Sequence, residues 1–89
     1  MSNLRVDFYY SISCGHCRRF SKTVEQIEQE RSNITVSRIE YNPEEHSEIK
    51  YIPTIVVSYL DKELGRFSSA LAKKDIDNWL DQLEEYITA

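Results

Sequence analysis

The fold is decided by the stretch Leu4-Arg-Val-Asp-Phe-Tyr-Tyr10 and by the Cys14-Gly-His-Cys17 motif that follows it. The first run is rich in β-branched and aromatic residues, which predicts a strand. Apolar residues from Phe20 to Ile27 follow the motif at helical spacing, which predicts a helix over residues 18–31. The only two cysteines of the chain therefore stand where a strand gives way to a helix.

This position predicts disulfide exchange. A cysteine in the first turn of a helix meets unpaired backbone N–H groups and the positive end of the helix dipole, and both favour the thiolate over the thiol. Only the thiolate attacks a disulfide. With a second cysteine one turn along the same helix, an internal displacement can then release the attacked substrate.

The composition excludes several other classes of function. The 89 residues make one domain, residues 1–89, and 11 basic against 15 acidic residues give a net charge of −4. This balance argues against nucleic acid or an anionic membrane as a partner. No run is long enough to span a bilayer, and residues 1–7 lack the apolar stretch of a secretory signal, so we expect a cytoplasmic protein. In that compartment a lone cysteine pair is catalytic or metal-binding rather than a structural disulfide.

The rest of the chain supplies three more strands and a second helix. We expect strands at residues 33–41, 54–60 and 63–68, a turn at Asp61-Lys62, and an amphipathic helix at residues 73–86. Asn42-Pro43 ends the first of these strands, and residues 44–50 form a loop or a short helix. A right-handed crossover makes the first two strands parallel, so the α/β order predicts a mixed four-stranded sheet flanked by helices.

Nearly the whole length of the chain resembles the thioredoxin superfamily. The landmarks occur in the order of that family: Val6-Asp7-Phe8, Cys14-Gly-His-Cys17, Asn42-Pro43, Tyr51-Ile52-Pro53-Thr54 and Ser69-Ala70-Leu71. The resemblance implies a thioredoxin fold in the trimmed β-α-β-(α)-β-β-α layout of glutaredoxins, because the extra N-terminal strand and helix of full thioredoxins are missing.

The resemblance also implies roles for the residues of the motif. Cys14 is the expected nucleophile and Cys17 the expected resolving thiol, and no cofactor is implied beyond a redox-active Cys14–Cys17 disulfide. Gly15 and His16 between the thiols are candidate redox-tuning residues. His16 either stabilises the Cys14 thiolate through an imidazolium or a polar N–H, or faces solvent with little effect.

Pro53 resembles the cis-proline of the family. In that interpretation the backbone of Ile52 is free to pair with an extended substrate, and Ile52, Pro53 and Thr54 form a substrate groove. The alternative is a trans proline that merely starts a strand.

Asp7 resembles the buried carboxylate that helps the resolving cysteine to lose its proton, and it is therefore a third redox-tuning candidate. It precedes Cys14 by one residue more than the family pattern. Either the loop at residues 11–13 absorbs an insertion, or Asp7 points to the other face of the sheet. His46, in an acidic stretch, is expected to be an ordinary surface residue.

Three functions remain open. The first is an enzyme, a monomeric thiol-disulfide oxidoreductase that reduces protein disulfides and is recycled by a reductase or by glutathione. The second is a glutathione-dependent glutaredoxin, although Tyr51-Ile52-Pro53 and Ser68-Ser69-Ala70 differ from the usual glutaredoxin segments. The third is a module whose cysteine pair binds zinc or an iron–sulfur cluster, although a closed zinc site needs about four ligands and only His16 and His46 remain. Arg18 and Arg19 either attract acidic partners or are simply solvated.

Overall fold

The computed structural model describes residues 4–68 and 72–88, and within them every predicted strand and both long helices are present. In chain order the elements are β1 (Leu4–Tyr10), α1 (Gly15–Glu30), β2 (Ile34–Glu40), β3 (Thr54–Tyr59), β4 (Lys62–Phe67) and α2 (Lys73–Thr88). The Ser69-Ala70-Leu71 landmark lies outside the described residues. The bounds of β1 are the predicted ones, and the others differ by at most three residues, most at α1, which begins three residues early because Cys14 caps it.

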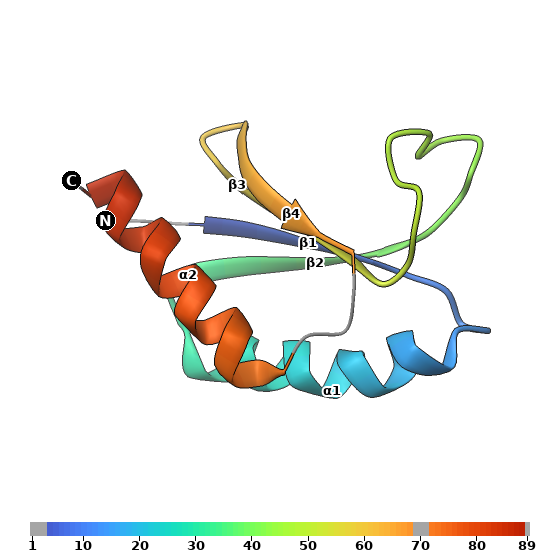
Figure 1. The fold of residues 1–89 in the computed structure, drawn as a ribbon, viewed down its shortest axis with the longest axis horizontal. Helices are drawn as coiled ribbons and strands as arrows, with labels where there is room; N and C mark the ends of the chain where they lie inside the picture. The colour runs from blue at the N-terminus through green and yellow to red at the C-terminus, as the bar shows by residue number, and fades with distance from the viewer. Residues whose placement is uncertain (1–3, 69–71, 89) are drawn as a thin grey trace.

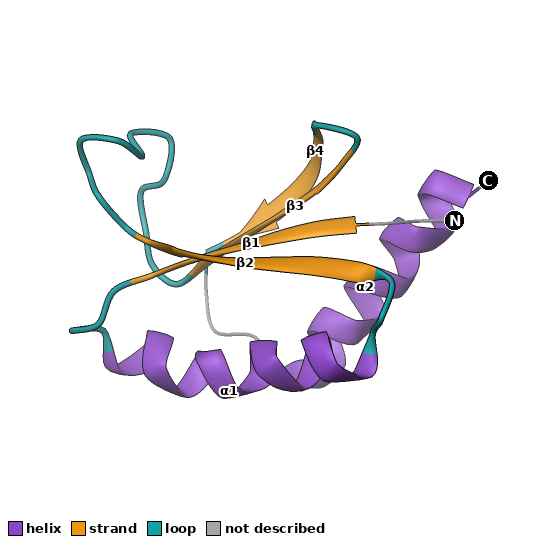
Figure 2. Cartoon of the chain, turned by 180° about the vertical axis from the view of Figure 1, so that it is seen from behind, coloured by secondary structure: helices purple, strands orange, loops and turns teal. Residues whose placement is uncertain are grey.

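The four strands form the predicted mixed sheet in the order β2-β1-β3-β4 (Figure 1). β1 pairs with β2 in parallel and with β3 antiparallel, and β4 pairs with β3 antiparallel. Both helices lie on the same face of this sheet, and residues 41–53 loop out on the other side of it (Figure 2). The molecule thus has two layers, and the start of α1, which follows Cys14, lies at one end of it.

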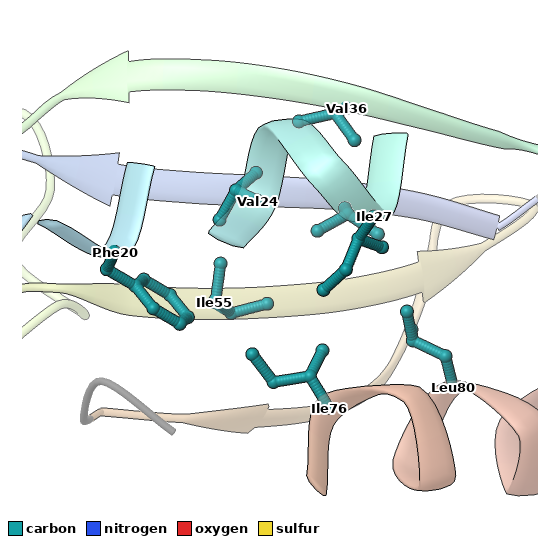
Figure 3. A pocket seen from close by; sticks show the side chains of 8 residues that line it. Phe20, Val24, Ile27, Val36, Ile55, Ile76 and Leu80 are labelled. Carbon is teal, nitrogen blue, oxygen red and sulfur yellow. The ribbon is translucent and has the colours of Figure 1, made fainter. Parts of the chain in front are cut away.

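The core lies between the sheet and the two helices. Leu4, Val6 and Phe8 alternate along β1 toward the helices and are nearly inaccessible to solvent. Figure 3 shows the side chains that line a small apolar cavity between the sheet and the helices, whose volume is only about 10 Å³. Its lining comes from the sheet and from both helices: Val6, Phe20, Val24, Ile27, Val36, Ile55, Ile76 and Leu80. A cavity this small leaves the core close-packed.

A half-buried arginine joins the two helices. The guanidinium of Arg31, just after α1, contacts Asp77 at 3.3 Å, Asp81 at 2.8 Å and Glu84 at 3.3 Å, all on α2. It also donates to the backbone carbonyl of Asp77 at 3.1 Å. These contacts hold the C-terminal end of α1 against α2, while the N-terminal end of α1 carries the cysteines.

Of two connections, the hairpin turn differs from its prediction, whereas residues 44–50 form the loop that was one of the two alternatives. The hairpin turn is Leu60-Asp61 rather than Asp61-Lys62, and both turn residues have positive φ (52° and 65°), as a two-residue type I′ turn requires. Residues 44–50 form turns and no helix. Side chains of this segment accept hydrogen bonds from backbone N–H groups, an alternative to helical hydrogen bonding. Asn42 Oδ1 accepts from Glu44 N, and His46 Nδ1 accepts from Asn42 N.

Candidate active site

Cys14 is the N-cap of α1. Its backbone is extended (φ −92°, ψ 113°), its N–H donates to the carbonyl of Ser11 at 3.1 Å, and its carbonyl accepts from Arg18 N at 3.1 Å. Its Sγ accepts a hydrogen bond from the backbone N–H of Cys17 at 3.1 Å. The thiol thus takes the place that a serine or aspartate oxygen has in an ordinary N-cap, and the N–H would stabilise negative charge on that sulfur.

The two thiols, both free, lie in different environments. Cys14 is half-buried, whereas Cys17 is only 2% exposed. Burial raises the pKa of the Cys17 thiol from its ordinary value of 9.0 to about 11, and the hydrogen bond and the charge of Cys14 act in the same direction. Cys17 therefore stays protonated at neutral pH, and Cys14 is the thiol that solvent reaches.

His16 is exposed and is bonded to an arginine. Nη2 of Arg19 lies 3.3 Å from Nδ1 of His16, and since a guanidinium can only donate, this contact needs the neutral imidazole with the proton on Nε2. Among the residues that the structure describes, no hydrogen bond joins His16 to either cysteine. Gly15 has nothing within 4 Å of where a Cβ would stand. The tuning roles of His16 and Gly15 stay predictions.

Asp7 faces away from the cysteines, which corrects the proton-relay expectation. It alternates with Val6 and Phe8, which point toward α1, so its carboxylate lies on the sheet face without helices. There it forms an ion pair with Arg5 at 3.0 Å and is 16% exposed. Of the two alternatives for Asp7, the structure has the second, and a carboxylate on that face is in no position to take a proton from Cys17.

The Ile52-Pro53 peptide bond is cis, as predicted. Tyr9 pairs with Thr54, so Pro53 lies at the end of the sheet where β1 runs toward Cys14. Thr54 is 2% exposed, and its hydroxyl donates to the carbonyl of Tyr51 and lies 3.2 Å from Ser68 Oγ. Thr54 thus fixes the loop before Pro53 through these hydrogen bonds. Ile52, in that loop, is half-buried. The substrate-groove role of the three residues stays a prediction.

His46 is not the ordinary surface residue that its acidic surroundings suggest. Its Nδ1 accepts from Asn42 N at 3.0 Å, and its ring lies between Tyr9 (centroids 5.2 Å apart, edge-on) and Tyr41 (6.2 Å, stacked). It therefore attaches the loop before Pro53 to β1. The four-residue spacing from Asn42 to His46 hints at the turn, but the contact with Tyr9 has no local signal.

Within residues 4–68 and 72–88, no group of three or more His, Cys, Asp or Glu side chains is placed to hold a metal ion. No helix of those ranges combines the length and the apolar character that crossing a membrane requires.

The thioredoxin family model matches residues 2–82. The chain belongs to the thioredoxin family. Among solved structures it is similar to Fasciola hepatica thioredoxin, with 24% identity, a TM-score of 0.80, and coverage of 91% of this chain and 81% of that one. Mitochondrial thioredoxin 3 of Saccharomyces cerevisiae, in its oxidised form, matches with 15% identity, a TM-score of 0.79, and coverage of 92% and 80%.

A third similar structure is malaria-parasite thioredoxin-2, described as a component of that parasite's protein secretion machinery. It has 15% identity, a TM-score of 0.83, and coverage of 91% of this chain and 84% of that one. At these identities the structures establish the thioredoxin fold. Membership of the thioredoxin family, together with the spacing of Cys14 and Cys17, supports thiol-disulfide oxidoreductase chemistry at the level of the family.

Proposed function

We propose that this protein reduces protein disulfides, with Cys14 as the nucleophile and Cys17 as the resolving thiol. The observation that carries the proposal is the contrast between the two sulfurs. Cys14 is accessible and accepts an N–H at a helix start, whereas Cys17 is buried and its pKa is raised to about 11. Cys14 is thus available to attack a substrate, and Cys17 stays a protonated thiol until the second displacement.

The reaction takes two displacements. In the first, the Cys14 thiolate attacks one sulfur of the substrate disulfide, a Cys14–substrate disulfide forms, and the other substrate sulfur leaves as a thiolate. In the second, Cys17 loses its proton to the departing thiolate or to water and attacks Cys14 Sγ. The Cys14–Cys17 disulfide forms, the second substrate thiol is released, and the two electrons have passed from the protein to the substrate.

Exposed apolar side chains near the site support a protein as the substrate. Ile12, in the loop before Cys14, is 73% exposed, and Tyr51, two residues before Pro53, is 68% exposed. Both belong to loops at the same end of the sheet, where β1 ends and β3 begins. These two side chains offer a protein substrate apolar contact on the loops that precede Cys14 and Pro53.

The partners in this proposal are protein disulfides and a recycling reductant, either a reductase or glutathione. We propose that the protein works as a monomer in a reducing compartment such as the cytoplasm, because the pair must return to the dithiol after each turnover. The alternative is that glutathione is the physiological reductant, as it is for glutaredoxins. Comparing the rate of recycling by a reductase with the rate of recycling by glutathione decides between the two.

The test is reduction of insulin disulfides by the purified protein, with Cys14→Ser and Ser13→Ala compared in parallel. Serine has no redox chemistry, so Cys14→Ser is expected to fall to the rate of the reductant alone. Ser13→Ala, one residue away, controls for disturbance of the loop and should keep most of the activity. Full activity in Cys14→Ser would contradict the mechanism, and stoichiometric zinc or iron in the purified protein would favour the metal-binding alternative.

A further inference from the structure

A groove of about 510 Å³ lies between the β1–α1 loop and the first turns of α1. Tyr10 and Ile12 line it from β1 and the loop, Arg18 and Lys22 line it from α1, and Cys17 also contributes to its lining. The loop projects past the start of α1 at this end of the molecule (Figure 1). The guanidinium of Arg18 donates to the carbonyl of Ile12 at 3.4 Å, which joins the two sides of the groove.

The two cations of the groove, Arg18 and Lys22, form no ion pair with the carboxylates of the described residues. Arg5, Arg31, Arg38 and Arg66 each form an ion pair, whereas no carboxylate in residues 4–68 and 72–88 pairs with Arg18 or Lys22. The two lie four residues apart, on one face of the helix. The first turn of α1 holds no acidic residue, so the positive end of its dipole is not compensated either. In a chain with a net charge of −4, this groove is a local excess of positive charge.

We propose that this groove binds an acidic segment of the protein substrate, next to the substrate cysteine that Cys14 attacks. The inference rests on the proposed function and adds a substrate class to it. Arg18 and Lys22 would contact carboxylates, while the exposed Ile12 and the ring of Tyr10 offer apolar contact to the carbon atoms of the same segment. Because one carboxylate would leave most of this volume empty, a chain segment suits the groove better than a small anion.

The test compares three peptide disulfides of equal length whose reactive cysteine is flanked on both sides by aspartate, by serine or by lysine. Two exposed ion pairs predict a kcat/KM for the aspartate peptide about twofold to thirtyfold above that for the lysine peptide at low salt. The ratio should approach one at about 0.5 M salt, where exposed charges are screened. Equal kcat/KM values for the three peptides at low salt would overturn the proposal.

Charge-reversal variants assign the preference to the groove. Arg18→Glu and Lys22→Glu should each lower the ratio of aspartate to lysine peptide by about threefold. Lys62→Glu makes the same charge change on β4, at the hairpin end of the sheet, and should leave the ratio as it is. An equal loss in Lys62→Glu would assign the preference to net charge and overturn the groove as its source.

A binding experiment separates this inference from the redox function. In a variant with both Cys14→Ser and Cys17→Ser, linear versions of the aspartate and lysine peptides are titrated while backbone amide shifts of Ile12, Arg18 and Lys22 are followed. Shifts with the aspartate peptide alone support the groove even if the wild type reduces no disulfide. If neither peptide moves these amide signals, the proposal is overturned. It is also overturned if oxidised glutathione binds more tightly than the aspartate peptide and that tighter binding is lost when Arg18 and Lys22 are changed.

Discussion

The backbone N–H of Cys17 donates a hydrogen bond to Sγ of Cys14 across 3.1 Å. The residue that carries the buried thiol therefore also supplies the donor to the accessible one. Replacing the side chain of Cys17 leaves that backbone donor in place, so the first displacement and the second can be separated by mutation.

We predict that Cys17→Ser traps substrates as mixed disulfides on Cys14. The first displacement needs only Cys14, and without the second thiol the covalent intermediate has no internal route to release. Non-reducing gels after incubation with an oxidised protein substrate should show a higher band that dithiothreitol removes. The variant with both cysteines changed to serine is the control, and the same band in that control would contradict the assignment.

The stability of the reduced protein should fall at alkaline pH because of Cys17. Its pKa is raised from 9.0 to about 11 in the folded state, so the folded protein holds this proton more tightly than the unfolded chain. The stabilisation is complete below pH 9 and is lost as the pH rises through 11, by on the order of 2 to 3 kcal/mol.

Urea melts of the wild type and of Cys17→Ala between pH 8 and pH 11 measure this effect. Tyrosines also ionise in this range, but they do so in both proteins, and the difference between the two melts isolates the Cys17 contribution. A pH-independent difference in the free energy of unfolding would show that burial does not hold Cys17 protonated.

Arg31 should stabilise the fold far more than an ordinary surface arginine. Its side chain is 15% exposed and contacts three carboxylates of α2. Arg31→Met should lower the free energy of unfolding by about 2 kcal/mol or more, because it leaves half-buried Asp77 and Glu84 with fewer partners. Arg38→Met, which breaks the more exposed pair with Glu28, should cost less than about 1 kcal/mol. Equal losses in both variants would contradict the helix-joining role.

The two glycines should respond to alanine in opposite directions. A Cβ at Gly65 would stand 3.0 Å from the Trp79 ring, so Gly65→Ala forces the ring or β4 to shift and should cost about 1 kcal/mol. Gly15 has open space and starts α1, so Gly15→Ala should gain about 0.5 kcal/mol. Thermal melts of the two variants compare their stabilities directly. A Gly65→Ala protein as stable as the wild type would show that the Trp79 ring can shift at no cost in stability.

The β-branched and aromatic residues of the run 4–10 predicted the first strand, and the helical spacing of Phe20, Val24 and Ile27 predicted the first helix. In the structure Leu4, Val6 and Phe8 alternate along β1 and are buried in one cluster with these three helix residues. The same alternation already implies that Asp7 lies on the face away from α1, since it stands between Val6 and Phe8. The family analogy, which placed a carboxylate near Cys17, was wrong where strand geometry alone is right.

Other features lacked a local signal. Leu60-Asp61 contains neither the glycine nor the asparagine that marks a type I′ turn, so the hairpin was predicted one residue late. Arg31 contacts residues more than forty positions away, and His46, in a loop, contacts Tyr9 in β1. The basic groove depends on how the loop at residues 11–13 folds against α1, and no periodicity describes that loop.

The central place of β1 in the sheet constrains the order in which the molecule can assemble on the ribosome. Val6 pairs with Val36 on one side and with Val57 on the other, so β1 has no antiparallel neighbour until β3 has been synthesised. Until then α1 has only the β1–β2 pair to cover, and α2, which completes the core, follows β4. Until β3 is added, one edge of the apolar strand β1 therefore stays unpaired, and unpaired strand edges make a growing chain prone to aggregate and dependent on chaperones.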